Sequence, residues 1–327
     1  MSAGHAKRTV LVMAHTGRPA ALASARLVAN MLLAAGIAVR VVETEAADLR
    51  CAGADVVPAT PEAVREAEMV IVLGGDGTLL RVAEITRPAG VPLLGINLGH
   101  VGFLAEAEAD DLPDVIDRVV DRRYVVEQRM TVDVTVRQNG TVVVTTWALN
   151  EASVEKAARE RVIEVVTEID GRPLSRWGCD GVVCATPTGS TAYAFSAGGP
   201  VVWPEVEALL MVPISAHALF AGPMVVSPSA VLAVEVIGGS GTSQPFAGVL
   251  WCDGRRRVDL PAGARIEVRR GTLPVLLARL LGPGESGAAA AGAPFTDRLV
   301  AKFGLPVAGW RGRVAGLDSE QEPPAHA

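Results

Sequence analysis

The sequence predicts an α/β N-terminal domain with a Rossmann-like parallel sheet, followed by a β-rich sandwich domain. Three observations predict this. Continuous apolar runs alternate with helical segments before residue 124. Alternating apolar and polar runs with hairpin turns follow it. The 327 residues exceed one ordinary domain. We expect the α/β domain at 1–124 and the sandwich at 125–294, with the tail 295–327 packing back on the first domain.

The first region alternates between strands and helices. Thr9–Ala14 is a continuous apolar run, which is typical of a strand buried on both faces. Pro19 stands at a helix start, and apolar residues recur at helical spacing until Gly36, so a helix is predicted between them. Further strands are predicted at Ile37–Val42, Met69–Leu73 and Pro92–Ile96, and further helices from Thr60 and near Asp111–Arg122.

Beyond that helix the hydrophobic period becomes that of a strand. Apolar and polar residues alternate strictly over Thr131–Val136, and Asn139-Gly140 then predicts a hairpin into a second strand, Thr141–Thr146. Later strands are predicted at Val162–Ile169, Val231–Ile237 and Arg265–Arg269. The low-complexity stretch Gly282–Pro294 predicts an exposed loop, and a helix is expected within Phe295–Trp310.

Composition limits the classes of function. Half of the residues are apolar and 20% are charged, which excludes a disordered chain. The net charge of −6 argues against a broad basic surface for nucleic acid or an anionic membrane, although a small cationic pocket for a phosphorylated ligand is compatible with it.

Two further features favour a cytoplasmic protein without a membrane partner. The uncharged stretch 208–234 contains three prolines and several polar residues, so short buried strands are predicted there rather than a membrane helix. The N-terminal apolar run is too short for a signal peptide. The four cysteines are interpreted as scattered reduced thiols: Cys51, Cys179, Cys184 and Cys252.

One motif carries chemistry. The strand Met69–Leu73 runs into Gly74-Gly75-Asp76-Gly77-Thr78, and a helical segment follows from Leu79. A strand, a glycine turn and a helix aim backbone N–H groups and a helix N-terminus at an anion. An aspartate there would hold a divalent metal or accept a proton from a hydroxyl that attacks phosphorus. The alternative is an ordinary Asp-Gly turn at the end of a strand.

The motif resembles known kinases. LGGDGTLLR, at 73–81, is similar to segments of phosphofructokinases, diacylglycerol-type lipid kinases and NAD kinases. GINLGHVGFLAE, at 95–106, and DGVVCATPTGSTAYAFSAGGP, at 180–200, resemble NAD kinases in particular. ALNE (148–151) and PISAHALF (213–220) follow the family's order, and the resemblance covers about 9–280. The absence of a P-loop pattern and the presence of only three lysines disfavour a P-loop NTPase.

The resemblance implies that NAD is phosphorylated on the 2′-hydroxyl of its adenosine ribose, giving NADP. It implies ATP or polyphosphate as donor, a divalent metal such as Mg²⁺ whose ligands the sequence does not indicate, and a homodimer or homotetramer. Asp76 would be the general base. The donor phosphates would be lined by Gly74, Gly75, Gly77 and Thr78.

The resemblance also implies a set of contacts to NAD. The residues are Asp76, Gly77, Arg81, Phe103, Asn150, Glu151, Arg161, Asp180, Thr191, Ala192, Tyr193, Ala194, Phe195 and Ser196. Each has a structural alternative, such as a solvated helix face for Arg81, a core position for Phe103 and a surface strand charge for Arg161. Many relatives carry a basic residue where this chain has Gly178.

Two rival functions stay open from the sequence alone. A lipid or sugar kinase would share only the glycine motif and would lack the segment Gly189–Ser196. A dinucleotide sensor would bind NAD(P) without turnover and would have no reason to retain a base at Asp76.

Overall fold

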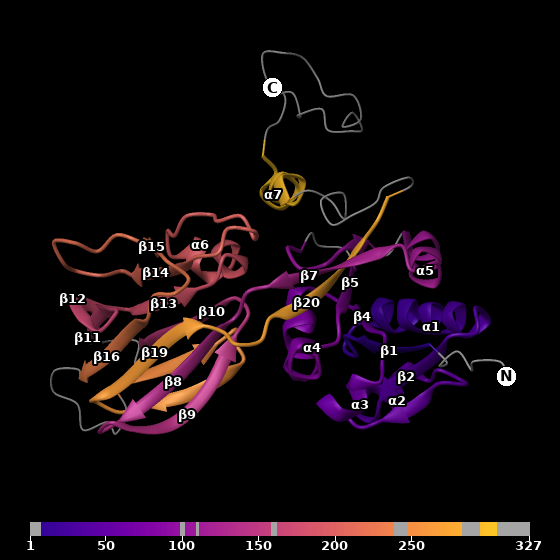
Figure 1. Ribbon diagram of the computed structural model, residues 1–327, viewed down its shortest axis with the longest axis horizontal. Coiled ribbons are helices and arrows are strands. Elements are labelled where there is room, and N and C mark those ends of the chain that lie inside the picture. Colours follow the sequence, from indigo (N-terminus) through magenta and orange to yellow (C-terminus); the bar gives the residue numbers. More distant parts are fainter. Residues whose placement is uncertain are drawn as a thin grey trace, which may run out of the picture.

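The computed structural model describes residues 8–98, 102–108, 111–157, 162–238, 247–282 and 295–305. Two bodies lie side by side in Figure 1: an α/β body, which contains the described residues up to Arg129, and a β-rich body. Strands β7 (Tyr124–Arg129) and β20 (Val275–Leu280) run beside each other on the side of the α/β body that faces the sandwich. β7 starts at Tyr124, where we place the boundary between the domains, and the boundary itself stays a prediction.

The α/β body is built on an eight-stranded sheet in the order β3-β2-β1-β4-β5-β20-β7, with β6 paired to β5. Every pairing in it is parallel except that of β7 with β20. Its strands are β1 (Thr9–Ala14), β2 (Ala38–Val42), β3 (Asp55–Val57), β4 (Met69–Leu73), β5 (Leu93–Asn97), β6 (Ala107–Glu108), β7 (Tyr124–Arg129) and β20 (Val275–Leu280). The predicted Rossmann-like parallel sheet is therefore confirmed.

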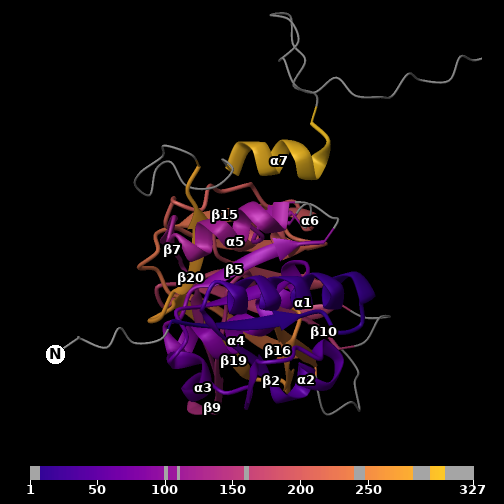
Figure 2. The ribbon, with the colours of Figure 1, turned by 90° about the vertical axis from the view of Figure 1, so that its right-hand side faces the viewer.

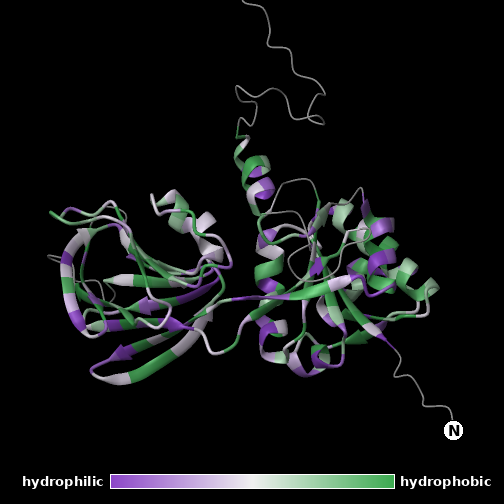
Figure 3. Ribbon diagram, turned by 45° about the horizontal axis from the view of Figure 1, so that its top comes forward, coloured by the Kyte–Doolittle hydropathy of each residue, from purple (hydrophilic) through white to green (hydrophobic). Residues whose placement is uncertain are grey.

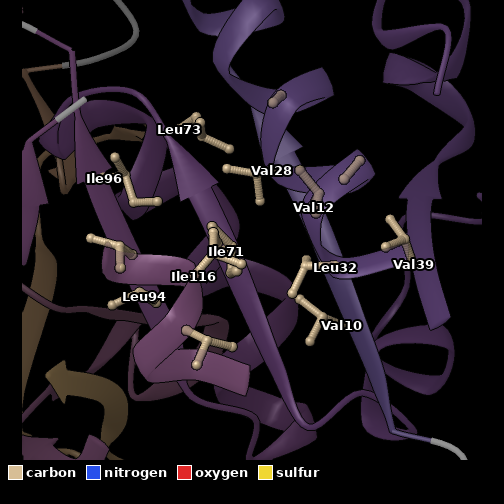
Figure 4. Close-up of a cluster of buried hydrophobic side chains, with 14 of the residues drawn as sticks. Val10, Val12, Val28, Leu32, Val39, Ile71, Leu73, Leu94, Ile96 and Ile116 are labelled. Atoms are coloured by element: carbon tan, nitrogen blue, oxygen red, sulfur yellow. The ribbon is translucent and has the colours of Figure 1, made fainter. Parts of the chain in front are cut away.

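Helices cover both faces of this sheet. On one face α1 (Pro19–Ala34) and α5 (Leu112–Val120) pack on alternate strand residues such as Val10 and Ile71, as Figure 4 shows for part of this cluster. On the other face lie α3 (Pro61–Arg65) and α4 (Asp76–Ala89). The short helix α2 (Glu43–Leu49) follows β2. Burial on both faces explains the continuous apolar runs of these strands.

The β-rich body is a sandwich of two six-stranded antiparallel sheets, as predicted. Their orders are β15-β14-β13-β10-β17-β18 and β12-β11-β16-β19-β8-β9. The core between them includes Trp177, which is fully buried. The strands are β8 (Val132–Gln138), β9 (Thr141–Ala148), β10 (Glu151–Lys156), β11 (Ile163–Ile169), β12 (Arg172–Cys179), β13 (Gly181–Ala185), β14 (Leu209–Ile214), β15 (Met224–Val226), β16 (Leu232–Gly238), β17 (Gly248–Cys252), β18 (Arg256–Leu260) and β19 (Ala264–Arg270). Along β8 buried and partly exposed residues alternate, and the change of colour along the strands of this body is visible in Figure 3.

Turns and short segments agree with the predictions. Asn139 and Gly140 both have positive φ, 50° and 79°, and join β8 to β9, as the two-residue hairpin requires. The uncharged stretch 208–234 forms β14, β15 and the start of β16. In the described part of the chain, no helix is long and apolar enough to cross a membrane. All four cysteines are free thiols.

The C-terminal segment forms one helix, α7 (Phe295–Phe303). It lies above both bodies in Figure 1 and along their upper side in Figure 2. It contacts the α/β body through Arg298 and the sandwich through rings that meet Phe195 and Trp203. The predicted loop Gly282–Pro294, except Gly282, and the chain after residue 305 lie outside the described residues.

Candidate active site

A pocket of about 510 Å³ opens where the strand order of the parallel sheet reverses. β2 and β3 lie on one side of β1, whereas β4 and β5 lie on the other. The loops that follow β1 and β4 therefore separate at this point, which is where doubly wound sheets place their ligands. The pocket is lined by His15, Thr16, Arg18, Gly75, Gly77, Thr78, Arg81 and Arg255.

The glycine turn lies at the wall of this pocket. β4 ends at Leu73 and α4 begins at Asp76, so only Gly74 and Gly75 separate the strand from the helix. Gly74 donates its N–H to the carbonyl of Ile96 at 3.0 Å, and a Cβ there would stand 2.5 Å from Oγ1 of Thr78. Only glycine fits this turn without displacing that side chain. Of the four residues predicted to line the donor phosphates, Gly75, Gly77 and Thr78 line the pocket, and Gly74 is buried beside them.

The carboxylate of Asp76 is fixed by the loop that follows β5. Oδ2 accepts the N–H of Phe103 at 3.0 Å and Oδ1 accepts the N–H of Leu104 at 3.2 Å. A Cβ on Gly102 would come within 2.4 Å of Oδ1, so a glycine is needed where the loop approaches the carboxylate. Asp76 is only half-buried. Its oxygens are therefore held in one place and are still within reach of a ligand.

Arginines supply positive charge to the pocket. Arg81 donates from Nη2 to Oε1 of Glu45 at 2.6 Å and to the carbonyl of Ala14 at 3.0 Å. Glu45 is 1% exposed, and its other oxygen accepts the N–H of Ala14 at 2.8 Å. Arg81 is thus oriented by a buried carboxylate. Arg18 follows β1, and Arg255 reaches the pocket from the sandwich. Three guanidinium groups at one pocket give an acidic protein a local site for anions.

A second group of predicted residues gathers where β10 begins. The backbone N–H groups of Leu149 and Asn150 both donate to the carboxylate of Asp253, at 3.0 and 2.7 Å. Gly189 lies so close to this segment that a Cβ would come within 2.0 Å of the Asn150 carbonyl oxygen. These contacts hold Asn150 and Glu151 against the segment 186–190.

Glu151 carries an unsatisfied buried oxygen. Its carboxyl group accepts the backbone N–H of Tyr193, whereas Oε2 is buried and has no hydrogen-bond partner among the described residues. Burial, and then the nearby charge of Asp253, raises the pKa of Glu151 to about 8. Such an oxygen suits a ligand that brings its own donor, for example a hydroxyl group.

Tyr193 lies near both Glu151 and Asp180. Lys156 pairs with Asp180 at 2.5 Å, and this hydrogen bond lowers the pKa of the aspartate, with a smaller contribution from Ser215. Burial raises the pKa of Tyr193, and the charges of nearby carboxylates, including Asp180 and Glu151, add to the effect. Lys156 therefore supplies a cation beside Asp180, while Gly178 two residues earlier carries none.

The segment Thr191–Ser196 ends a short 3₁₀ turn and forms the four-residue helix α6 (Tyr193–Ser196). Thr191 hydrogen-bonds through Oγ1 to the carbonyl of Thr188, and Ala194 is buried. Thr191, Ala192 and Tyr193 are half-buried, whereas Phe195 and Ser196 are exposed.

The two phenylalanines among the predicted NAD contacts, Phe103 and Phe195, lie against α7. The ring of Phe195 stands 4.7 Å from that of Phe303, and Phe103 packs on Phe295 and Phe303 at 5.8 and 6.1 Å. Phe103 is 9% exposed, so a base could stack on it only after these rings move aside, and that contact stays a prediction. Arg161 lies outside the described residues.

The sequence reasoning missed several residues of the site, among them Asp253 and Lys156. His15, Thr16 and Arg18 follow β1, and the parallel order of strands was the signal that could have placed them beside the glycine turn. Glu45 and Arg255 left no local signal, because only the tertiary fold brings them to Arg81 and Glu84.

No metal cage is present among the described residues. Within them, no group of three or more His, Cys, Asp and Glu side chains is placed to hold a metal ion. Mg²⁺ is commonly bound by one or two carboxylates together with substrate phosphates, and Asp76 beside the pocket fits that mode.

The Rossmann-like sheet with a cationic pocket at its switch point defines the class: a nucleotide-binding type of α/β fold joined to a β-sandwich. Comparison with known proteins identifies the family. The model of the ATP-NAD kinase N-terminal domain matches residues 10–124, and that of the ATP-NAD kinase C-terminal domain matches residues 149–280.

Close relatives agree. The chain is 65% identical to NAD kinase 2 of Streptomyces avermitilis over 309 residues, which covers 93% of this chain and 97% of the relative. It is 62% identical to NAD kinase of Thermobifida fusca over 321 residues, covering 95% and 94% of the two chains. The chain belongs to the NAD kinase family and is an enzyme of that activity.

Solved structures share the fold. Yeast NADH kinase in complex with NADH superposes with a TM-score of 0.74 at 24% identity, over 84% of each chain. NAD kinase from Archaeoglobus fulgidus in complex with ATP gives 0.62 at 25% identity, over 82% of this chain and 92% of that one.

Proposed function

We propose that this enzyme transfers the terminal phosphoryl group of ATP or polyphosphate to the 2′-hydroxyl of the adenosine ribose of NAD, with Asp76 as general base. One observation carries the proposal. The carboxylate of Asp76 stands at the first residue of α4, beside the cationic pocket, with both oxygens held by backbone N–H groups. A fixed, partly exposed carboxylate next to a phosphate site is what proton abstraction from an attacking hydroxyl requires.

The pocket at the switch point is the proposed donor site. Its lining combines the N-terminus of α4 with Arg18, Arg81 and Arg255, all of which favour phosphate oxygens. The relative from Archaeoglobus fulgidus was solved with ATP, which supports ATP as a donor here. Phosphate-binding groups make up most of the lining, so polyphosphate is proposed as the alternative donor.

NAD is proposed to bind along the sandwich side of the site. The unpartnered oxygen of Glu151 would accept a ribose hydroxyl, since a carboxylate accepts two hydrogen bonds from a vicinal diol. Asn150 precedes Glu151 in the chain, and Tyr193 lies near both Glu151 and Asp180. The full set proposed to contact NAD is Asp76, Gly77, Arg81, Phe103, Asn150, Glu151, Arg161, Asp180 and Thr191–Ser196.

The transfer step follows from this placement. The 2′-oxygen attacks the terminal phosphorus of the donor while its proton passes to Asp76. A new oxygen–phosphorus bond forms, and the bond from that phosphorus to the bridging oxygen of the donor breaks. The guanidinium groups of Arg81 and Arg255 would hold the phosphate charge during the transfer. A divalent cation such as Mg²⁺, brought in by the donor phosphates near Asp76, would neutralise part of that charge.

A homodimer or homotetramer is also proposed. Large apolar side chains are exposed around β14 and β15: Leu219, Phe220 and Val225. An exposed apolar surface of this kind favours contact with a second copy of the chain. Light scattering tests this, and a fully active monomer would contradict it. We place the enzyme in the cytoplasm, where free thiols such as its four cysteines stay reduced.

The experiment is a direct assay. Purified enzyme is incubated with NAD, Mg²⁺ and either ATP or polyphosphate, and NADP is measured with an NADP-specific dehydrogenase. We expect NADP with at least one donor, and the comparison of the two rates gives the donor preference. Binding of NAD without NADP from any donor would instead favour a dinucleotide sensor.

A further inference from the structure

Arg298 of α7 binds the loop that fixes Asp76. Nη1 donates to the carbonyl of Phe103 at 3.2 Å and to that of Ala105 at 2.7 Å. Nη2 donates to the carboxylate of Glu106 at 2.7 Å. Arg298 is 8% exposed, although it comes from a helix near the C-terminal end of the described chain.

The same loop supplies the two N–H groups that Asp76 accepts. Phe103 and Leu104 donate to the carboxylate, while the carbonyls of Phe103 and Ala105 accept from Arg298. The Arg298 guanidinium thus binds carbonyl groups, and the Asp76 carboxylate binds N–H groups, of the same three-residue stretch, Phe103–Ala105. A displacement of that stretch moves both N–H donors away from Asp76.

Glu106 connects the contact between Arg298 and the loop to strands of the parallel sheet. Its Oε2 accepts Arg279 at 2.6 Å as well as Arg298, and its Oε1 accepts the N–H of Leu280 on β20 at 3.0 Å. Its backbone N–H donates to the carbonyl of Gly95 on β5 at 2.7 Å. Glu106 is 2% exposed in its side chain, so the two arginines neutralise a buried charge. Arg298 is therefore held rigidly enough to restrain the loop.

We propose that Arg298 is a positioning residue for catalysis, holding the Phe103–Ala105 backbone so that its N–H groups orient the carboxylate of Asp76. The proposal rests on the proposed role of Asp76 as general base. Arg298 is not among the residues that line the proposed donor pocket. Because proton abstraction needs the carboxylate within hydrogen-bond reach of the hydroxyl, a small misplacement slows the step far more than it weakens binding of either substrate.

The test compares Arg298→Ala and Arg298→Lys in the full chain, alone and combined with Asp76→Asn. We expect Arg298→Ala to lower kcat about 10- to 100-fold while the KM values for NAD and donor change less than about threefold. Arg298→Lys keeps the charge but lacks the planar fork that reaches the two carbonyls through Nη1 and Glu106 through Nη2. Its kcat is therefore expected between that of the unsubstituted enzyme and that of Arg298→Ala. Millimolar guanidinium is expected to restore part of the kcat of Arg298→Ala.

The double variant separates positioning from a general structural effect. In an Asp76→Asn background there is no base to orient, so adding Arg298→Ala is expected to cause no further loss of kcat. A loss of the same factor in both backgrounds would overturn the proposal, as would an unchanged kcat in Arg298→Ala. Should Arg298→Ala not fold, the same cycle with Arg298→Lys decides. Lys302→Ala, which removes a cation from an exposed position of the same helix, is the matched control and is expected to keep normal kcat.

The outcome for Asp76 alone is separate. Near-normal turnover in Asp76→Asn would end the proposed role of Asp76, whereas a large loss in Asp76→Asn with no coupling to Arg298 would end only the positioning role.

Discussion

Glu84 on α4 and Arg255 in the β17–β18 turn form a 3.0 Å ion pair that joins the helix carrying Asp76 to the sandwich. A few residues further along α4, Arg87 pairs with Asp133 and stacks on Trp147 at 4.5 Å. α4 is therefore attached to the sandwich at two points. The first of them also brings the guanidinium of Arg255 to the wall of the pocket.

Arg255→Ala is expected to raise the KM for the phosphate donor about 10- to 100-fold, because a charge-assisted hydrogen bond to phosphate is lost. The KM for NAD should change much less. Steady-state kinetics with the donor and NAD varied in turn measure both effects.

Arg257→Ala is the matched control for this variant. Arg257 lies two residues away, is exposed, and pairs with Asp259 rather than lining the pocket. Equal effects of the two substitutions, or an unchanged donor KM in Arg255→Ala, would remove Arg255 from the donor site.

NAD binding is expected to release a proton from Glu151. With a pKa of about 8 the free enzyme holds this carboxyl largely protonated at pH 7. Ribose hydroxyls that donate to it favour the charged form, so its proton leaves when NAD binds. Calorimetry at pH 7 in two buffers of different ionisation enthalpy measures the released protons. Glu151→Gln should bind NAD more weakly and release none; an equal release from the variant would exclude Glu151 as the source.

The same group makes stability depend on pH. Between pH 4.5 and about 8 the unfolded carboxyl is ionised while the folded one keeps its proton, so stability falls as pH rises through this window. Glu151→Gln lacks this fall. Its free energy of unfolding, measured by urea denaturation relative to the unsubstituted enzyme, should therefore increase by a few kcal/mol from pH 4.5 to pH 8. A constant difference across that range would show that Glu151 ionises normally.

Gly189→Ala is expected to destabilise the NAD side of the site. The new Cβ would meet the Asn150 carbonyl oxygen at 2.0 Å, so the backbone must shift at the position that holds Glu151. We expect a loss of about 1–3 kcal/mol in unfolding free energy and at least tenfold weaker NAD binding. Gly222→Ala, where nothing lies within 4 Å of the added Cβ, should leave both unchanged. Normal NAD affinity in Gly189→Ala would contradict the proposed role of this segment.

Local patterns predicted much of the fold. The apolar run Thr9–Ala14 became β1 with those bounds, and Thr60 caps α3 by accepting the N–H of Ala63. These features depend only on residues that are close together in the sequence. The pairing of β20 with β5 in the first sheet was not predicted, because the sequence of a single strand does not indicate which strand it pairs with.

The candidate site likewise contains some residues that local sequence predicted and others that only the tertiary fold brings together. The glycine turn and Asp76 are contiguous in sequence, so the motif predicted them as a unit. Arg255 and Arg298 come from distant parts of the chain and reach α4 and the Phe103–Ala105 loop through tertiary contacts. Nothing in their local sequence distinguishes them from surface arginines. The resemblance to NAD kinases supplied the predicted NAD contacts, which the fold then brought partly together.

The rate of NADP formation by Asp76→Asn tests the proposed mechanism most directly. The amide keeps the shape of the side chain but cannot take the proton of the 2′-hydroxyl. We expect kcat to fall by about three orders of magnitude, with the Kd for NAD from calorimetry changed less than about tenfold. Asp117→Asn, the same change at an exposed position of α5, should retain normal kcat. Near-normal turnover in Asp76→Asn would contradict the assignment of Asp76 as the general base.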